Sequence, residues 1–461
     1  MKNKLQELLY AIVLGMMLNF TAAGLANGAG IPKNIIIMIG DGCGYNHVVA
    51  TNYYQTGEAG AQVYEKFPVT LGMSTYSASG DGYDPTKAWT DFSYVTHRPT
   101  DSAAAATAMS TGVKTNNGAI GVDEKKHRLE HLVEHLEKFG KSSGVVTTVM
   151  FSHATPAGFI AHQERRDQYS DIAREMILDS PLEVIMGCGH PHYDDNGRLL
   201  EQAKFDYTYV GGDDVWQALK QGRVESDSDT DGVKDTWHLI ETRQEFLALG
   251  SGDTPKRVIG VPRVRMTLQH ERAGNKKTEP FVDPLVQDVP TLPEMTAAAL
   301  NILDNDADGF FLLIEGGAID WAGHENNSGR MIEETIDFNK AVDAVVAWIN
   351  ESSSWDQTLL VVTADHETGY LTGPGSGEQD KMGDSAVKPI WNPIVNNGQG
   401  KLPGLEWHIT KHTNSLVPFY SKGAGCELFL KYADETDAVC GAYLNNIEIA
   451  QAIFALFPTA Q

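Results

Sequence analysis

The chain has 461 residues, of which 42% are apolar and 9% aromatic, and its formal net charge is −25. The apolar fraction is ordinary for a folded globular protein, and the length suits one large α/β domain with insertions or two domains. The strong negative charge argues against a nucleic-acid-binding surface. An acidic protein that binds an anion needs a local positive centre, which metal ions would supply.

The first 26 residues have the pattern of a secretory signal peptide. Lys2 and Lys4 precede an apolar segment at about 8–20, and the small-residue stretch Gly24-Leu25-Ala26 follows it. This order predicts cleavage after Ala26. A retained membrane anchor is the alternative, but the apolar segment is short for a membrane span. We therefore expect a periplasmic or secreted protein without a membrane anchor after cleavage.

Five apolar runs rich in β-branched residues predict buried strands. In chain order they cover residues 34–42, 144–150, 182–189, 309–317 and 358–369. Helical patterns lie between them, at 102–110, 127–140 and 329–352. Near-continuous apolar strands that alternate with helices are typical of a sheet buried on both faces. The sequence therefore predicts an α/β fold with a large, mostly parallel central sheet flanked by helices on both faces.

Residues 27–461 show no repeat and no clear linker, so we expect a single domain after the signal peptide (1–26). Residues 190–300 are more polar and less regular, which predicts a peripheral insertion. Residues 370–425 contain Gly-rich runs such as GPGSGEQDKMG and VNNGQGKLPG, which predict loops.

Candidate metal ligands follow the predicted strands. Asp41, Glu315 and the pair Asp365-His366 come directly after three of the apolar runs, and Thr155 lies shortly after a fourth. In open α/β sheets, ligands bind beyond the carboxyl ends of the strands. These side chains can therefore converge on one site although they lie far apart in the sequence.

Two further segments add to this set. Asp320 and His324 stand one helical turn apart in DWAGHEN, so both side chains can face one ion, and His412 lies in a late loop. Mixed Asp and His ligation suits zinc. An all-oxygen set such as Asp41, Thr155 and Glu315 suits magnesium.

Six motifs containing these residues resemble those of the alkaline phosphatase family. They are NIIIMIGDGCG, TDSAAAATAMSTGVKT, HATPAGFIAHQERR, EGGAIDWAGHENN, TADHETGY and KHTNSLVP, and they span positions 34 to about 420 in matching order. The resemblance implies a three-layer α/β sandwich that hydrolyses small phosphate monoesters. It also implies two zinc ions, one magnesium ion and a homodimer.

The resemblance also implies a role for each matching residue. The first zinc would be held by Asp320, His324 and His412. The second would be held by Asp41, Ser102, Asp365 and His366. The magnesium would be held by Asp41, Thr155 and Glu315.

Three residues would act on the phosphate itself. Ser102 would be the nucleophile and form a phosphoserine, which a zinc-activated water would then hydrolyse. Arg166 would clamp two phosphate oxygens, and Asp101 would orient Arg166. Ser102 and Asp101 also stand where the 102–110 helix begins, so helix capping accounts for part of this motif.

Two positions depart from the best-known bacterial pattern of the family. His153 stands where that pattern has Asp, and Trp321 stands where it has Lys. Both would lie around the magnesium and the phosphate, where such changes tune metal affinity and rate. The third site would then hold magnesium or zinc.

Other enzyme classes on the same scaffold fit the sequence less well. A sulfatase would show Cys or Ser in a C/S-x-P-x-R context, which TDSAAAA lacks. A phosphodiesterase would usually have Thr at position 102 and no clamp at Arg166. A non-catalytic metal- or phosphate-binding protein would lack one of the expected ligands.

Three features lie outside the motifs. Asp227, Asp229, Asp231 and Asp235 have the spacing of a calcium-binding loop, with a plain acidic surface loop as the alternative. Cys426 and Cys440 are close enough in sequence for a disulfide. His127, His131 and His135 repeat every four residues, and we expect them on the solvent side of an amphipathic helix.

Overall fold

A central β-sheet organises the described part of the chain, which comprises residues 30–226, 232–275, 277, 279–378 and 389–459 of this computed structural model. The sheet has 11 strands in the order β18-β19-β2-β17-β10-β1-β9-β3-β4-β8-β7. Pairing is parallel from β10 to β7, and toward the other edge it is antiparallel except between β2 and β19, which are parallel. Their bounds are β1 (Asn34–Gly40), β2 (Val69–Ser74), β3 (Ser142–Met150), β4 (Val184–Cys188), β7 (His238–Ile240), β8 (Val258–Gly260), β9 (Phe310–Gly316), β10 (Thr358–Thr363), β17 (Val417–Gly423), β18 (Glu435–Asp437) and β19 (Gly441–Asn445).

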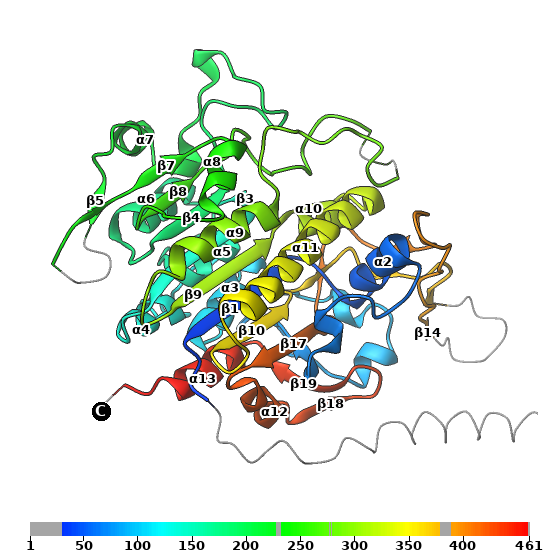
Figure 1. Ribbon diagram of the computed structural model, residues 1–461. Helices are drawn as coiled ribbons and strands as arrows, with labels where there is room; N and C mark the ends of the chain where they lie inside the picture. The colour runs from blue at the N-terminus through cyan, green and yellow to red at the C-terminus, as the bar shows by residue number, and fades with distance from the viewer. Residues whose placement is uncertain (1–29, 227–231, 276, 278, 379–388, 460–461) are drawn as a thin grey trace, which may run out of the picture.

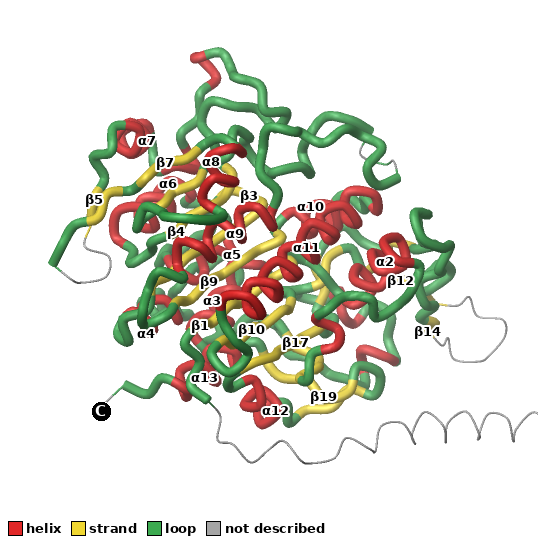
Figure 2. The backbone as a smooth tube through the Cα atoms, in the orientation of Figure 1, coloured by secondary structure: helices red, strands yellow, loops and turns green. Residues whose placement is uncertain are grey.

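Helices cover both faces of this sheet, as Figures 1 and 2 show. One layer packs α2 (Tyr45–Thr56), α8 (Arg243–Leu249), α9 (Leu292–Leu303) and α11 (Ser328–Ser352) against one another. The other packs α3 (Ser102–Thr111), α4 (Leu132–Glu137), α5 (Ala154–Ile160) and α13 (Ile447–Leu456). The remaining helices are α6 (Tyr169–Arg174), α7 (Asp213–Lys220), α10 (Ala318–His324) and α12 (Phe429–Tyr432). The α/β sandwich predicted from the sequence is confirmed.

The central strands are buried along their whole length, as the apolar runs predict. Every residue of β1, β3, β9 and β10 is buried. Each strand is therefore covered by helices on both faces, which explains why no polar alternation marks it in the sequence.

Residues 190–300 contribute to the sheet as well as to its periphery. This segment supplies β7 and β8 beyond β4, and α7 and α8 beside them. Residues 367–413 include three short antiparallel pairs: β11 (Glu367–Thr368) with β16 (His412–Thr413), β12 (Leu371–Thr372) with β15 (Glu406–Trp407), and β13 (Gly377–Glu378) with β14 (Pro389–Ile390). A further pair joins β5 (Glu225–Ser226) to β6 (Asp235–Thr236).

The predicted helix at 127–140 is wrong in extent, because α4 covers only Leu132–Glu137. The Asp123 carboxylate accepts the backbone N–H groups of Lys125 and His127, which holds the preceding residues in a turn. The histidine interpretation is also wrong for two of the three side chains. His127 is exposed, but His131 is 0% and His135 6% exposed.

The predicted disulfide is not formed, because Cys426 and Cys440 are free thiols. Cys426 opens the short turn after β17, whereas Cys440 lies between β18 and β19, where its backbone N–H donates to Asp437 at 2.8 Å. Burial raises the pKa of Cys440 to about 12 and that of Cys426 to about 11. The two cysteines therefore occupy separate environments despite their short separation in sequence.

Most of the predicted calcium loop lies outside the described residues, including Asp227, Asp229 and Asp231. Asp235 is described, and its carboxylate forms an ion pair with the Lys256 Nζ at 2.7 Å. The signal-peptide residues 1–26 also lie outside the described part. Among the described helices, none combines the length and apolar character needed to span a bilayer.

Candidate active site

Three neighbouring strands bring the acidic side chains together. β1 pairs with β9 and with β10, and the register places Ile39 beside both Glu315 and Thr363. Asp41 and Asp365 follow β1 and β10 directly, so these two carboxylates and Glu315 meet at one edge of the sheet. We call Asp41, Glu315 and Asp365 the carboxylate group.

The carboxylate group is fully buried and carries little compensating charge. Burial and the charge of Asp365 raise the pKa of Asp41 well above its usual value. Burial also raises the pKa values of Glu315 and Asp365 to about 7. Neither Asp41 carboxylate oxygen has a hydrogen-bond partner among the described residues. Buried carboxylate oxygens without partners fit a bound cation, because a lone buried charge is unfavourable.

Thr147 and Thr155 place two hydroxyl groups around Glu315. The Thr147 hydroxyl donates a short hydrogen bond to Glu315 Oε2. This bond opposes the effect of burial on the Glu315 pKa, whereas the Thr155 hydroxyl has no hydrogen-bond partner among the described residues. Thr155 is fully buried in the first turn of α5. The set Asp41, Thr155 and Glu315 therefore offers the hard oxygen donors that magnesium prefers.

Asp320, His324 and His412 form a second cluster, which we call the histidine group. The Nε2 atoms of His324 and His412 lie 3.0 Å apart, and Asp320 lies 3.3 Å from the first and 3.5 Å from the second. The opposite ring nitrogens, Nδ1, face backbone carbonyls: Thr410 at 2.8 Å for His324 and Thr100 at 2.9 Å for His412.

These outer hydrogen bonds have a chemical consequence. An Nδ1–H that donates to a carbonyl leaves Nε2 as the lone-pair atom, which is how second-shell partners orient metal-binding imidazoles. The two Nε2 atoms and the Asp320 carboxylate thus converge as ligands with the donor chemistry of a zinc site. Without a metal, burial opposes the charged form of His324, but the bond to Asp320 outweighs it and raises the His324 pKa to about 9, so metal binding would displace a proton from Nε2.

His366 lies between the two groups. Its Nε2 is 3.2 Å from Asp365, 3.6 Å from Asp41 and 3.2 Å from the Ser102 hydroxyl oxygen. Burial lowers the His366 pKa well below its usual value, so the ring is neutral and able to bind a metal. The imidazoles of His366 and His412 stack with ring centroids 3.6 Å apart, which joins this set to the histidine group.

Ser102 begins α3, and its side chain is buried beside His366. Asp101 caps this helix by accepting the Ala104 N–H at 3.0 Å. The other Asp101 oxygen accepts from Arg166 Nη1 at 3.1 Å and from the Gly118 N–H at 3.0 Å. One carboxylate therefore fixes both the helix that carries Ser102 and the guanidinium of Arg166.

Arg166, His153 and Trp321 line an open cleft of about 480 Å³ that reaches Ser102. His153 Nε2 lies 3.4 Å from Arg166 Nη2, and the His153 ring meets Trp321 edge-on at 5.9 Å between centroids. Burial, together with the Arg166 charge, lowers the His153 pKa to about 3, so His153 is neutral. The neighbouring Arg165 points away, pairs with Asp167 and is 71% exposed.

The sequence interpretation missed several residues that touch this site. Thr368 donates to Asp320 at 2.5 Å, and the Gly42 N–H donates to Asp365 at 3.1 Å. Both residues lie within the quoted motifs, so their position near the metal ligands could have been predicted from the sequence. His270 lines the cleft from a segment of irregular structure, and no local sequence pattern marks it.

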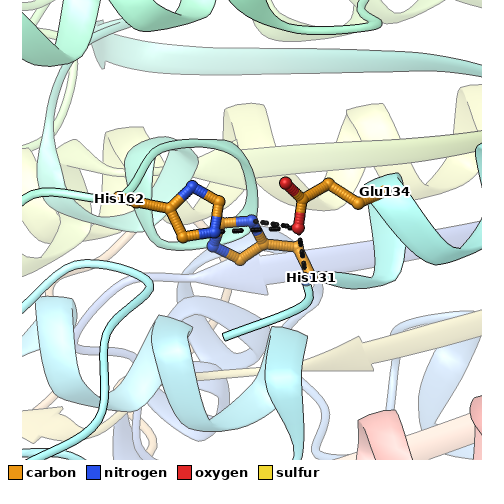
Figure 3. Close-up of side chains that lie close together, drawn as sticks. All are labelled: His131, Glu134 and His162. Carbon is orange, nitrogen blue, oxygen red and sulfur yellow. Dashed lines mark hydrogen bonds and ion pairs between the residues drawn. The ribbon is translucent and has the colours of Figure 1, made fainter. Parts of the chain in front are cut away.

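A separate histidine cluster explains the buried His131. His131, Glu134 and His162 lie together at the start of α4, where Figure 3 shows both rings beside the Glu134 carboxylate. His162 also has Leu129 O at 2.8 Å from Nε2 and Glu175 Oε1 at 3.1 Å from Nδ1. Both nitrogens of His162 therefore already have protein partners, which suits a structural role.

Comparisons with known proteins agree with this geometry. The family model described as alkaline phosphatase matches residues 32–398. Alkaline phosphatase 3 of Bacillus subtilis is 32% identical over 73% of this chain, which spans 61% of that relative's length. Alkaline phosphatase 4 of the same organism is 28% identical over 93% of this chain and 89% of its own.

The comparison with solved structures agrees with the family match. The structure of the alkaline phosphatase from the Antarctic bacterium TAB5 matches with a TM-score of 0.61 and 25% identity, over 94% of this chain and 100% of that one. The family match covers most of the sequence and includes every residue of the cleft except His412. The chain therefore belongs to the alkaline phosphatase family, a family of metal-dependent phosphoric monoester hydrolases.

Proposed function

We propose that this protein hydrolyses small phosphate monoesters to an alcohol and inorganic phosphate, with Ser102 as the nucleophile. The observation that carries the proposal is the position of the Ser102 hydroxyl. It lies 3.2 Å from His366 Nε2, where the histidine and carboxylate groups meet, and it shares the cleft with Arg166. A phosphate held by Arg166 would then present its phosphorus to Ser102.

The proposed cofactors are two zinc ions and one magnesium ion. One zinc site comprises Asp320, His324 and His412, the other comprises Asp41, Ser102, Asp365 and His366, and the magnesium site comprises Asp41, Thr155 and Glu315. When bound, the ions would supply the positive charge that lowers the pKa values of Ser102 and of a water molecule and stabilises the leaving oxygen. A structure of a mutant TAB5 enzyme contains magnesium at one of that enzyme's metal sites.

The covalent steps follow from the nucleophile. The Ser102 hydroxyl gives up its proton and its oxygen forms a bond to phosphorus, while the bond from phosphorus to the ester oxygen breaks and that oxygen takes up a proton, which releases the alcohol. A water molecule then attacks the phosphoserine, the bond from phosphorus to the Ser102 oxygen breaks to release phosphate, and a proton from the water restores the Ser102 hydroxyl. The N-terminus of α3 adds partial positive charge beside the phosphoryl group in both steps.

Arg166 holds the substrate during these steps. Its planar guanidinium can bind two non-bridging phosphate oxygens at once. The 3.1 Å hydrogen bond to Asp101 limits the directions that the guanidinium can take. Asp101 is thus a positioning residue, because it acts through Arg166 and through the cap of α3.

His153 and Trp321 give the third metal site its character. A neutral His153 stands where the common bacterial pattern has a carboxylate, so the site has one negative charge fewer. Fewer negative ligands around a magnesium ion weaken its binding. Trp321 replaces a lysine in that pattern, which removes a cation from the phosphate side of the cleft.

A pair of substrates tests the proposed activity. We expect turnover of p-nitrophenyl phosphate, little turnover of bis-p-nitrophenyl phosphate, and loss of the monoesterase activity in EDTA. Preference for the diester would favour a phosphodiesterase. Absence of EDTA-sensitive monoesterase activity in the zinc- and magnesium-loaded protein would refute the proposal.

We also propose export and a homodimer, both from the sequence. The signal-peptide pattern supports a periplasmic or secreted location, and family resemblance supports the dimer. N-terminal sequencing of protein recovered from the cell envelope or medium should start after Ala26. Light scattering should give twice the mass of the mature chain. A retained N-terminus, or the mass of one chain, would contradict the respective proposal.

A further inference from the structure

A second set of potential metal ligands lies in the wall of the active-site cleft. His270, Glu271 and Glu325 line the same cleft as Ser102 and Arg166. His270 and Glu271 come from the irregular segment that follows β8, whereas Glu325 comes directly after α10. Two chain segments far apart in sequence therefore converge here, as in the site already described.

The geometry of this set is that of metal ligands around an ion. His270 Nε2 lies 3.6 Å from Glu271 Oε1 and 3.7 Å from Glu325 Oε2, and one ligand atom of each residue lies within 4.8 Å of the others. These separations are too long for hydrogen bonds. Ligands bound to one zinc ion at about 2.0–2.2 Å are spaced at about this distance.

The state of His270 points independently to a ligand. Its side chain is 0% exposed, and neither ring nitrogen has a hydrogen-bond partner among the described residues. Buried polar atoms normally have a partner, because leaving one unpaired costs free energy. The ring also packs edge-on against Trp321 at 6.4 Å between centroids, which holds Nε2 toward the two carboxylates.

A cation bound by these three residues would also suit the charge of the proposed substrate. The cleft takes an anionic substrate under the proposed function. A divalent ion bound by Glu271 and Glu325 would add positive charge to its wall. One imidazole and two carboxylates leave a zinc ion an open coordination position, and this one would face the cleft.

We propose that His270, Glu271 and Glu325 bind a fourth divalent cation, of zinc-like preference, in the wall of the cleft. The cation adds positive charge to the cleft wall and assists capture of the phosphate monoester. Binding of the ion is independent of the activity, whereas the role in capture rests on the proposed function.

Metal stoichiometry tests the site directly. The variants are Glu271→Gln, Glu325→Gln and the double variant, each as the full chain. Glu201→Gln is the matched control, because Glu201 is an exposed carboxylate (80%) outside this cleft. After saturation with zinc and magnesium and removal of free ions, elemental analysis should find one metal equivalent fewer in the double variant than in the wild type and the control.

A second measurement guards against misfolding. Each metal-depleted protein is titrated with zinc alone, and the heat of binding is measured by calorimetry. The double variant should show one binding event fewer than the wild type, with the other events unchanged. His270→Gln should lose the same event. Circular dichroism establishes that each variant is folded. Equal metal content and equal titrations in the wild type and all folded variants would overturn the proposed site.

Kinetics then test the role in capture. With p-nitrophenyl phosphate, His270→Gln loses the ion but keeps both carboxylates, so it should show KM raised by about tenfold and a much smaller change in kcat, because electrostatic capture acts on encounter. The double variant loses the ion and both negative charges together, so its KM should stay near that of the wild type. An unchanged KM in His270→Gln after loss of the metal would overturn the role in capture. A wild type that binds the extra ion but hydrolyses no monoester would refute the proposed function while supporting the site.

Discussion

The histidine group and the carboxylate group lie side by side but differ in how their charges are balanced. In the histidine group, burial alone would raise the Asp320 pKa, but the hydrogen bond from His324 and the histidine charges lower it. In the carboxylate group, burial dominates, and the pKa values of Asp41, Glu315 and Asp365 are all raised. One group is internally compensated, and the other lacks a matching cation.

This difference predicts different dependence on metal ions. The histidine group keeps its ligands oriented through protein hydrogen bonds, namely those to Thr410 and Thr100. The carboxylate group concentrates negative charge in a buried space, so a cation relieves a larger penalty there. Removing metal should therefore disturb the carboxylate group more than the histidine group.

The largest expected effect comes from the nucleophile Ser102, which lies beside His366 where the two groups meet. Ser102→Ala should reduce kcat/KM for p-nitrophenyl phosphate by about 1000-fold or more, because the nucleophile is lost. Since the other ligands of both groups remain, we expect nearly full metal content by elemental analysis. Loss of all metals with the activity would show instead that Ser102 holds the two groups together.

Loss of Arg166 should have the next largest effect. Arg166→Ala should lower kcat/KM by about 100-fold, because two charge-assisted hydrogen bonds to phosphate are lost. Arg166→Lys should recover part of this, since lysine keeps the charge but not the planar fork. Arg166 also lowers the pKa values of Asp41 and Glu315, so its removal should leave the carboxylate group still less balanced. Equal activity of the Arg166→Ala and Arg166→Lys variants would contradict the proposal that Arg166 clamps the phosphate.

The pH dependence of Tm in the metal-free protein tests the contrast between the carboxylate group and the histidine group. In the metal-free protein, the Glu315 and Asp365 pKa values of about 7 exceed their ordinary values. Groups with raised pKa values stabilise the fold below their ordinary pKa, and this contribution is lost as the pH rises through the folded value. Tm of the metal-free protein should therefore fall between about pH 4 and pH 7. Metal-loaded protein should not show this fall, and parallel curves for the two forms would contradict the comparison.

The smallest expected effect concerns the third metal site. His153→Asp adds a carboxylate beside the oxygen ligands, so magnesium should activate the variant at a concentration about tenfold lower than it activates the wild type. Zinc-dependent activity should change little, because His153 does not touch the histidine group. Identical magnesium titrations of the two proteins would show that His153 does not tune this site.

The sequence predicts the ligands at the strand ends well because each of them directly follows an apolar run that can be recognised locally. Asp41 and Asp365 follow continuous apolar runs, and parallel strands bring their ends to one edge of the sheet. Ser102 is equally readable, since Asp101 before an alanine run predicts the helix start that the structure has.

The remaining features depend on tertiary contacts that no local pattern encodes. The spacing of His131 and His135 fits an exposed helix face, but His135 is buried against Phe457 O at 2.7 Å, from the end of the chain. Short sequence separation suggested a disulfide between Cys426 and Cys440, but the fold places them in separate environments. His270 joins the cleft through tertiary contacts with Trp321 of α10 and with Glu325, which follows that helix.

The stretch from Thr100 to Ser102 links three parts of the site through consecutive residues. The Thr100 carbonyl orients His412, the Asp101 carboxylate orients Arg166, and Ser102 presents its hydroxyl to His366. A backbone shift of a few tenths of an ångström here would misalign ligand, clamp and nucleophile together. Thermal inactivation should therefore be abrupt, because local loosening of this one stretch removes every function of the cleft at once.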